Sequence, residues 1–221
     1  MSDSIQYLPE DKMATLITDD YRMLQVLSRF GISLGFGDKL ITEVCADNGV
    51  DVNTFLAVVN FITGGSAQRG LSYPLSLDSL LHYLKQSHEY FLDFLLPSIR
   101  RKLLDAIVLK DSDVSFLMIK LFDEYVAGVT DHMLEEEKFL FNSSSFKLSE
   151  EDKLPATSKH HAKVGSKLNE LKRIIIKYCP GESNANLLNA ALYDIYRCEE
   201  ELKSHCLIED LLLLPAMVTQ Q

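Results

Sequence analysis

The chain has 221 residues, enough to bury a sizeable core in one or two domains. Its 32 acidic residues outnumber its 22 basic residues, the formal net charge is -10, and no basic run is interleaved with aromatic residues, so the composition argues against a nucleic-acid partner. The four cysteines show neither C-x-x-C spacing nor the density of a disulfide scaffold, the N-terminus lacks the order of a signal peptide, and no apolar run reaches membrane-spanning length. We therefore expect a cytoplasmic protein that binds neither nucleic acid nor a membrane.

A polar segment with several turn residues, from Thr63 to Gly70 and followed by Pro74, divides a short front part from a long rear part. We expect a small helical domain over residues 1–68 and a second domain over residues 69–221. No strand pattern is present in the front part. Its predicted helices are Tyr21–Phe30 after a cap at Asp20, a helix near Lys39–Asp47, and Val52–Phe61 after a cap at Asp51, with a glycine-rich turn at Gly31–Gly37.

The rear part carries four long helical patterns joined by polar connections, which predicts an all-α, up-down-up-down four-helix bundle. Pro97 lies inside the first pattern and should bend or split that helix. The predicted helices are Ser76–Val108, Ser112–Phe141, Pro155–Tyr178 and Asn186–Leu214.

Two copies of the pattern His-x-x-x-Glu are the main chemical feature of the chain. A single such pair is usually a solvated pair on a helix surface. Here, however, the apolar stripe of the second helix runs from Leu117 to Val129 and continues at His132 and Glu136, so this pair should face the core.

The last helix repeats the arrangement, because its apolar stripe from Leu188 to Leu202 continues at His205 and Glu209. A carboxylate on a core seam costs several kcal/mol unless it is paired or bound to a metal. The two pairs therefore favour a metal site.

Two further histidines lie on the apolar stripes of the other two helices: His88 on the first and His161 at the start of the third. A lone histidine on an apolar face is more often a satisfied core residue than a ligand. In an up-down-up-down bundle, however, the starts of the first and third helices lie at the same end as the finishes of the second and fourth. The bundle would therefore bring all six side chains to one level.

Four imidazoles and two carboxylates suit a pair of first-row metals, with Glu136 and Glu209 bridging and two histidines on each metal. Iron is the leading metal, and manganese or a mixed pair remains open, whereas zinc normally takes one four-coordinate site and calcium and magnesium prefer oxygen ligands. The remaining coordination positions could take oxo or hydroxo bridges and small ligands such as dioxygen, peroxide or nitric oxide.

Several neighbouring side chains are set aside. His82 is rotated off the seam of His88, and His160 leaves the stripe that His161 begins, although the choice between those two stays open. Cys206 should point away from the site. Tyr125 could donate to the ligands but is more often an ordinary core tyrosine in such a position, and Cys198 is expected to be a small core residue.

The rear segment resembles the hemerythrin-like domain of the repair-of-iron-centres proteins, bacterial di-iron proteins tied to recovery of iron–sulfur clusters after nitrosative or oxidative stress. The resemblance implies two non-haem irons held by four histidines and two bridging glutamates, and a hemerythrin-like bundle. The implied ligands are His88, His132, Glu136, His161, His205 and Glu209. The stretches that carry it are Ser87–Tyr90, His132–Phe141, His160–Gly165, His205–Glu209 and Leu214-Pro215.

The front part is similar to the short N-terminal domain of that family, with one departure. The segment Phe30–Lys39 matches a segment that usually carries two adjacent cysteines, and here those positions are Gly35 and Phe36. A thiol role of that domain cannot be carried over. Cys45 is nearby but lies on a predicted helix, so it is not a substitute.

Two functions follow as expectations. The first is a protein of the nitrosative and oxidative stress response that assists repair of damaged iron–sulfur proteins, by iron donation or nitric oxide chemistry. The second is a sensor or carrier that binds dioxygen or nitric oxide without turnover. A purely structural bundle with an empty site is the third reading, and whether catalysis occurs is left open.

Overall fold

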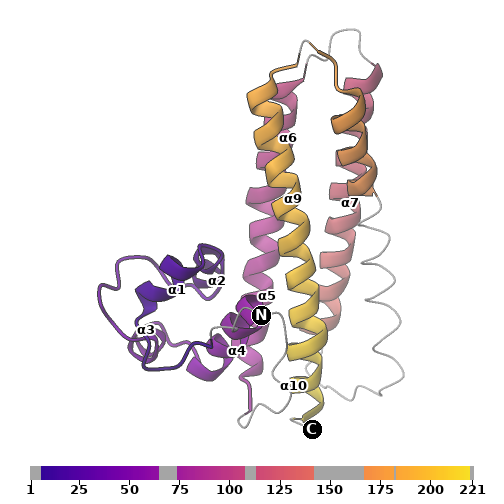
Figure 1. Cartoon of the computed structure of the whole chain (residues 1–221). Coiled ribbons are helices and arrows are strands. Elements are labelled where there is room, and N and C mark those ends of the chain that lie inside the picture. Colours follow the sequence, from indigo (N-terminus) through magenta and orange to yellow (C-terminus); the bar gives the residue numbers. More distant parts are fainter. Residues whose placement is uncertain (1–5, 65–73, 108–112, 142–166, 182, 220–221) are drawn as a thin grey trace. The chain divides into compact units, whose positions relative to one another are not determined.

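The computed structural model of the chain (Figure 1) describes residues 6–64, 74–107, 113–141, 167–181 and 183–219. It divides into two compact units. The front unit comprises Met1–Ser87 and Ser204–Gln221, and the bundle unit comprises His88–Lys203. The expected boundary between residues 68 and 69 lies outside the described residues and stays a prediction.

The front unit begins with four short helices, and all three helices predicted in this part of the sequence are present. Asp51 caps the last of them, because its Oδ1 accepts hydrogen bonds from the Thr54 N–H at 2.8 Å and the Thr54 hydroxyl at 2.6 Å. The predicted cap at Asp20 accepts the N–H of Arg22 at 2.9 Å. The helices are α1 (Met13–Asp19), α2 (Met23–Arg29), α3 (Ile41–Asp47) and α4 (Val52–Gly64).

Helix α1 was missed by the sequence analysis. It has only seven residues, and its buried apolar side chains, Met13 and Leu16, are too few to establish a helical period. Backbone hydrogen bonds attach it to a distant segment, since the Met13 N–H donates to the Lys39 carbonyl at 3.1 Å and the Ile41 N–H donates to the Asp11 carbonyl at 2.8 Å. Tertiary contacts, not local sequence, therefore hold this helix.

Three of the rear helices follow the predicted ranges closely. Of the predicted third helix, Pro155–Tyr178, residues 167–178 are helical, and residues 155–166 lie outside the described residues. The first is α5 (Leu77–Glu89), which continues through the π-helical turn η1 (Tyr90–Leu95) into α6 (Leu96–Ala106). The others are α7 (Asp113–Phe141), the helical residues 167–178, and α9 (Ala185–Ile208), which continues through the π-helical turn η3 (Glu209–Leu213) into α10 (Leu214–Thr219). The described residues contain no strand, so the all-α fold class is confirmed.

A single apolar core fills the bundle unit and draws on all four of its helices. Fully buried side chains include Ile99 on α6, Phe122 on α7, Leu171 on the third helix and Ile195 on α9. This is the packing expected when four amphipathic helices turn their apolar stripes inward.

Four ion pairs link the described helices of the bundle unit into a ring, each joining two of them. Arg100–Asp123 and Lys167–Glu124 are exposed, and exposed pairs contribute up to about 1 kcal/mol each, whereas the Lys172 side chain in a third pair is only 9% exposed. The exposed pairs therefore report the order of the helices more than they stabilise it. The pairs are Arg100–Asp123 (α6 to α7, 2.7 Å), Lys167–Glu124 (third helix to α7, 2.5 Å), Lys172–Glu199 (third helix to α9, 2.5 Å) and Lys102–Asp194 (α6 to α9).

Two prolines account for the π-helical turns. Pro97 and Pro215 each lack an N–H and would clash with a carbonyl of the preceding turn. Just before each proline the helix widens instead: the Leu96 N–H donates to the Phe91 carbonyl and the Leu214 N–H donates to the Glu209 carbonyl, both five residues back. The expected interruption at Pro97 is thus a widened turn within a continuing helix.

Within the part of the chain that the structure describes, no helix has the length and apolar character needed to cross a membrane.

Phe122→Ala should lower the free energy of unfolding by about 3–5 kcal/mol, because it leaves a cavity in the bundle core. Phe116→Ala on the same helix is the matched control: Phe116 is 70% exposed whereas Phe122 is 0% exposed, so the control should change stability by no more than about 0.5 kcal/mol. Urea denaturation followed by circular dichroism measures both, and equal effects would contradict the described core.

Candidate metal centre

Helix α7 places His132 and Glu136 one turn apart on its buried face. The His132 Nε2 lies 2.9 Å from the Glu136 Oε1, and the two residues are only 4% and 7% exposed. The buried Tyr125 and Val129 precede them on the same face, as predicted. The apolar stripe predicted for this helix was wrong at its first residue, because Leu117 is exposed.

His88 approaches the same carboxylate from the last turn of α5. Its Nε2 lies 3.4 Å from the Glu136 Oε2, and the residue is 1% exposed. Within the bundle unit, two imidazoles therefore turn the same ring atom, Nε2, towards the two oxygens of one buried carboxylate. That is the arrangement in which a bridging carboxylate and two histidine ligands could share metal ions.

Glu137 is a site residue that the sequence analysis missed. Its Oε1 lies 3.2 Å from the Nδ1 of His88, on the opposite edge of the imidazole from Glu136. The signal in the sequence was the run Glu135-Glu136-Glu137, in which a second carboxylate directly follows the predicted ligand.

The second His-x-x-x-Glu pair lies in the front unit, at the end of α9 and the start of η3. The His205 Nε2 lies 3.0 Å from the Glu209 Oε1, and the two residues are 1% and 4% exposed. Ile208 and Leu212, which flank Glu209 on this helix, are buried as well. The expectation that both pairs face inward is confirmed.

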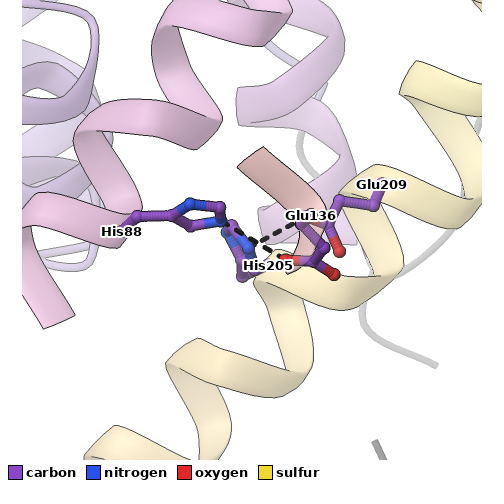
Figure 2. A group of neighbouring side chains, drawn as sticks. All are labelled: His88, Glu136, His205 and Glu209. Carbon is purple, nitrogen blue, oxygen red and sulfur yellow. Dashed lines mark ion pairs between the residues drawn. The ribbon is translucent and has the colours of Figure 1, made fainter. Parts of the chain in front are cut away.

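Figure 2 shows four of the predicted ligands: His88 and Glu136 belong to the bundle unit, and His205 and Glu209 belong to the front unit. Within the front unit, the Cys206 sulfur also lies within 4.8 Å of a Glu209 carboxylate oxygen, so Cys206 offers a further donor atom there. The expectation that Cys206 points away from the site was therefore wrong. That expectation assumed that the buried face of the helix is only one residue wide. At the end of α9, however, the consecutive residues His205 and Cys206 are both buried, so the buried face is wider.

The remaining predicted ligand, His161, and its neighbour His160 lie outside the described residues. The assignment of His161, and the ligand role of the full set of six, stay predictions. His82 is exposed, which agrees with setting it aside.

The donor set fits a first-row transition metal. It combines imidazole nitrogens with carboxylate oxygens, which suits iron, manganese or zinc, whereas calcium and magnesium prefer oxygen ligands alone. Burial adds a physical reason for a cation. Carboxylates as buried as Glu136 and Glu209 are costly to keep charged unless a positive charge or a bound cation lies beside them.

Tyr125 and Cys198 form a separate contact within the bundle core. The Tyr125 hydroxyl lies 3.8 Å from the Cys198 sulfur, which supports the reading of both as core residues. Burial, chiefly, raises the pKa of the Cys198 thiol to about 12. Burial also raises the pKa of the Cys45 thiol to about 12, with a smaller contribution from Asp51, so neither thiol is activated.

Residues 79–217 match the family model described as Hemerythrin HHE cation binding domain, and this match covers more than half of the chain. It spans all three described histidines and both glutamates of the predicted ligand set. No curated protein and no solved structure matched the chain.

The raised thiol pKa values predict selective alkylation. At pH 8 only about one in ten thousand of the Cys45 and Cys198 thiols would be the reactive thiolate, so iodoacetamide should modify the half-buried Cys179 at least about tenfold faster than either. Peptide mapping by mass spectrometry measures the three rates, and urea-unfolded protein, in which all should react, is the control. Comparable native rates would show that burial does not protect these thiols.

Proposed function

The chain belongs to the hemerythrin HHE cation binding domain family, and from this premise we propose that it is a di-iron protein that assists the repair of damaged iron–sulfur clusters under nitrosative or oxidative stress. The proposed ligands are His88, His132, Glu136, His161, His205 and Glu209. Manganese or a mixed pair is the alternative content of the same ligand set.

The observation that carries the metal proposal is the burial of two His-Glu pairs whose Nε2 and carboxylate oxygens lie 2.9 and 3.0 Å apart. Surface pairs at this spacing are common, but these residues are at most 7% exposed. Their carboxylates need a compensating positive charge, and bound cations supply it in the form that the family description names.

The side chains would divide the work as follows. His88, His132 and His205 would hold the metal ions through the Nε2 atoms that they turn towards the glutamates, and Glu136 and Glu209 would supply negative charge and carboxylate oxygens. Bound iron would supply redox chemistry and open positions for small ligands such as nitric oxide or dioxygen. The low exposure of the ligands keeps bulk water from the site.

The repair role is supported by resemblance in both parts of the chain. The rear part carries four stretches that resemble the ligand-bearing stretches of the repair-of-iron-centres proteins, and in the front part the segment Phe30–Lys39 resembles part of the short N-terminal domain of that family. On this proposal the partners are damaged iron–sulfur proteins. They would either receive iron from this protein or have nitric oxide removed by it.

A feature of the front unit favours the second function, a sensor or carrier of dioxygen or nitric oxide. Gly35 stands where a cysteine was expected, and its φ of 105° is a conformation that side-chain-bearing residues rarely adopt. Cys45 is the one cysteine in residues 1–68, and burial raises its pKa to about 12. Residues 1–68, whose one cysteine is not activated, suit a partner surface better than a redox module.

Metal analysis tests the ligand set. Protein purified from iron-replete cells should contain about two iron ions per chain, and Glu136→Ala or Glu209→Ala should lower this sharply because a bridging carboxylate is lost. His82→Ala, which changes an exposed histidine, should leave the content unchanged. Comparison of His161→Ala with His160→Ala decides which of the two is a ligand. A wild-type protein without iron or manganese would overturn the metal proposal.

Cluster reactivation separates the two functions. The iron-loaded protein should restore activity to an iron–sulfur enzyme damaged by nitric oxide, and a metal-depleted His132→Ala, Glu136→Ala variant should not. Reversible binding of nitric oxide or dioxygen, with equal reactivation by wild type and variant, would favour the sensor or carrier instead.

A further inference from the structure

The imidazole of His88 lies between carboxylates from two consecutive residues of α7. Its Nε2 faces the Glu136 Oε2 at 3.4 Å, and its Nδ1 faces the Glu137 Oε1 at 3.2 Å. Consecutive residues on an α-helix project about 100° apart, so the Glu136 and Glu137 carboxylates approach the ring from different directions. Glu136 faces Nε2 and Glu137 faces Nδ1.

The two carboxylates differ in burial. The Glu136 side chain is 8% exposed and the Glu137 side chain is 36% exposed. Glu136 thus lies with the buried donor atoms, whereas Glu137 lies at the rim, where water can reach part of it. A ligand role therefore suits Glu136, and a supporting role suits Glu137.

The hydrogen-bonding chemistry of imidazole determines which ring nitrogen of His88 can bind a metal. An ionised carboxylate only accepts hydrogen bonds, so each of the two carboxylates favours a proton on the ring nitrogen that it faces. A neutral imidazole carries only one proton, and a metal ion on Nε2 requires that proton to be on Nδ1, the side of Glu137. When Nδ1 carries the proton of a neutral imidazole, Nε2 presents its lone pair. Nε2 is also the atom that His132 and His205 turn towards their glutamates.

We propose that Glu137 is a positioning residue that holds His88 in the tautomer with a proton on Nδ1 and its ring in the orientation that binds metal through Nε2. This inference rests on the proposed metal-binding function and deepens it. Glu137 does not touch the metal. It accepts the Nδ1–H hydrogen bond and fixes the ring plane. This hydrogen bond also makes the imidazole more basic, so that Nε2 is a stronger ligand for a metal.

The first test uses the metal-free full-length protein, so it does not depend on metal content. Nitrogen-15 NMR of the histidine side chains measures the share of His88 rings that carry the proton on Nδ1. Glu137→Leu removes the acceptor at Nδ1 and leaves the Glu136 carboxylate at Nε2, so it should lower the Nδ1–H share relative to the wild type. Glu137→Gln retains an oxygen acceptor and should restore the Nδ1–H form.

The second test measures metal affinity. Competition with a chelator for Fe(II) should show a loss of about 10–100-fold for Glu137→Leu and a smaller loss for Glu137→Gln, which keeps the hydrogen bond without the charge. Glu170→Leu, an exposed glutamate on the third helix, is the matched control and should bind as the wild type does. Circular dichroism confirms that each variant is folded.

The outcomes separate this inference from the proposal beneath it. A Glu137→Leu protein with wild-type tautomer and wild-type affinity would overturn the positioning role. If neither the wild type nor the Glu170→Leu control binds iron, the metal proposal fails, while the tautomer measurement still decides whether Glu137 orients His88. If Glu137→Leu alone does not fold, the Glu137→Gln comparison with the wild type decides the case.

Discussion

The structure depends on one electrostatic constraint: two glutamates are buried in helices, each one turn after a buried histidine. Glu136 and Glu209 are 7% and 4% exposed, and a buried negative charge is costly unless a positive charge or a bound cation balances it. An apolar pair in their place would pack more favourably. Retaining the carboxylates in the core is therefore best understood as a cost accepted for cation binding, which is the property that the family description names.

The rest of the fold meets this constraint in two ways. An apolar core formed by four helices keeps the backbone in place, with ion pairs ordering the helices at the surface. The ligand-bearing segments then adjoin widened turns: η1 begins two residues after His88, and η3 begins at Glu209 itself. Each turn ends at the first leucine of a Leu-Leu-Pro sequence, and π-helical turns are frequent at functional sites.

The front unit constrains which function the metal chemistry can serve. Its helices are held by hydrogen bonds between distant segments, such as the reciprocal pair between the Tyr7 backbone and the Asn60 side chain at 2.7 and 3.0 Å. Cys45, the one cysteine of residues 1–68, is buried, and the position expected to carry another is a glycine at positive φ. On the proposed repair function, chemistry on a damaged cluster would come from the predicted metal ligands, and residues 1–68 would contribute recognition.

Much of this architecture was predictable from local pattern. Helical periodicity located the rear helices, and the continuation of the apolar stripes at His132, Glu136, His205 and Glu209 predicted their burial, because a 3.6-residue period assigns each side chain to a face. Periodicity could not find α1, the burial of Cys206 or the contact between Glu137 and His88. Those depend on which distant segment packs against a helix and on how wide its buried arc becomes, and only the tertiary structure decides that.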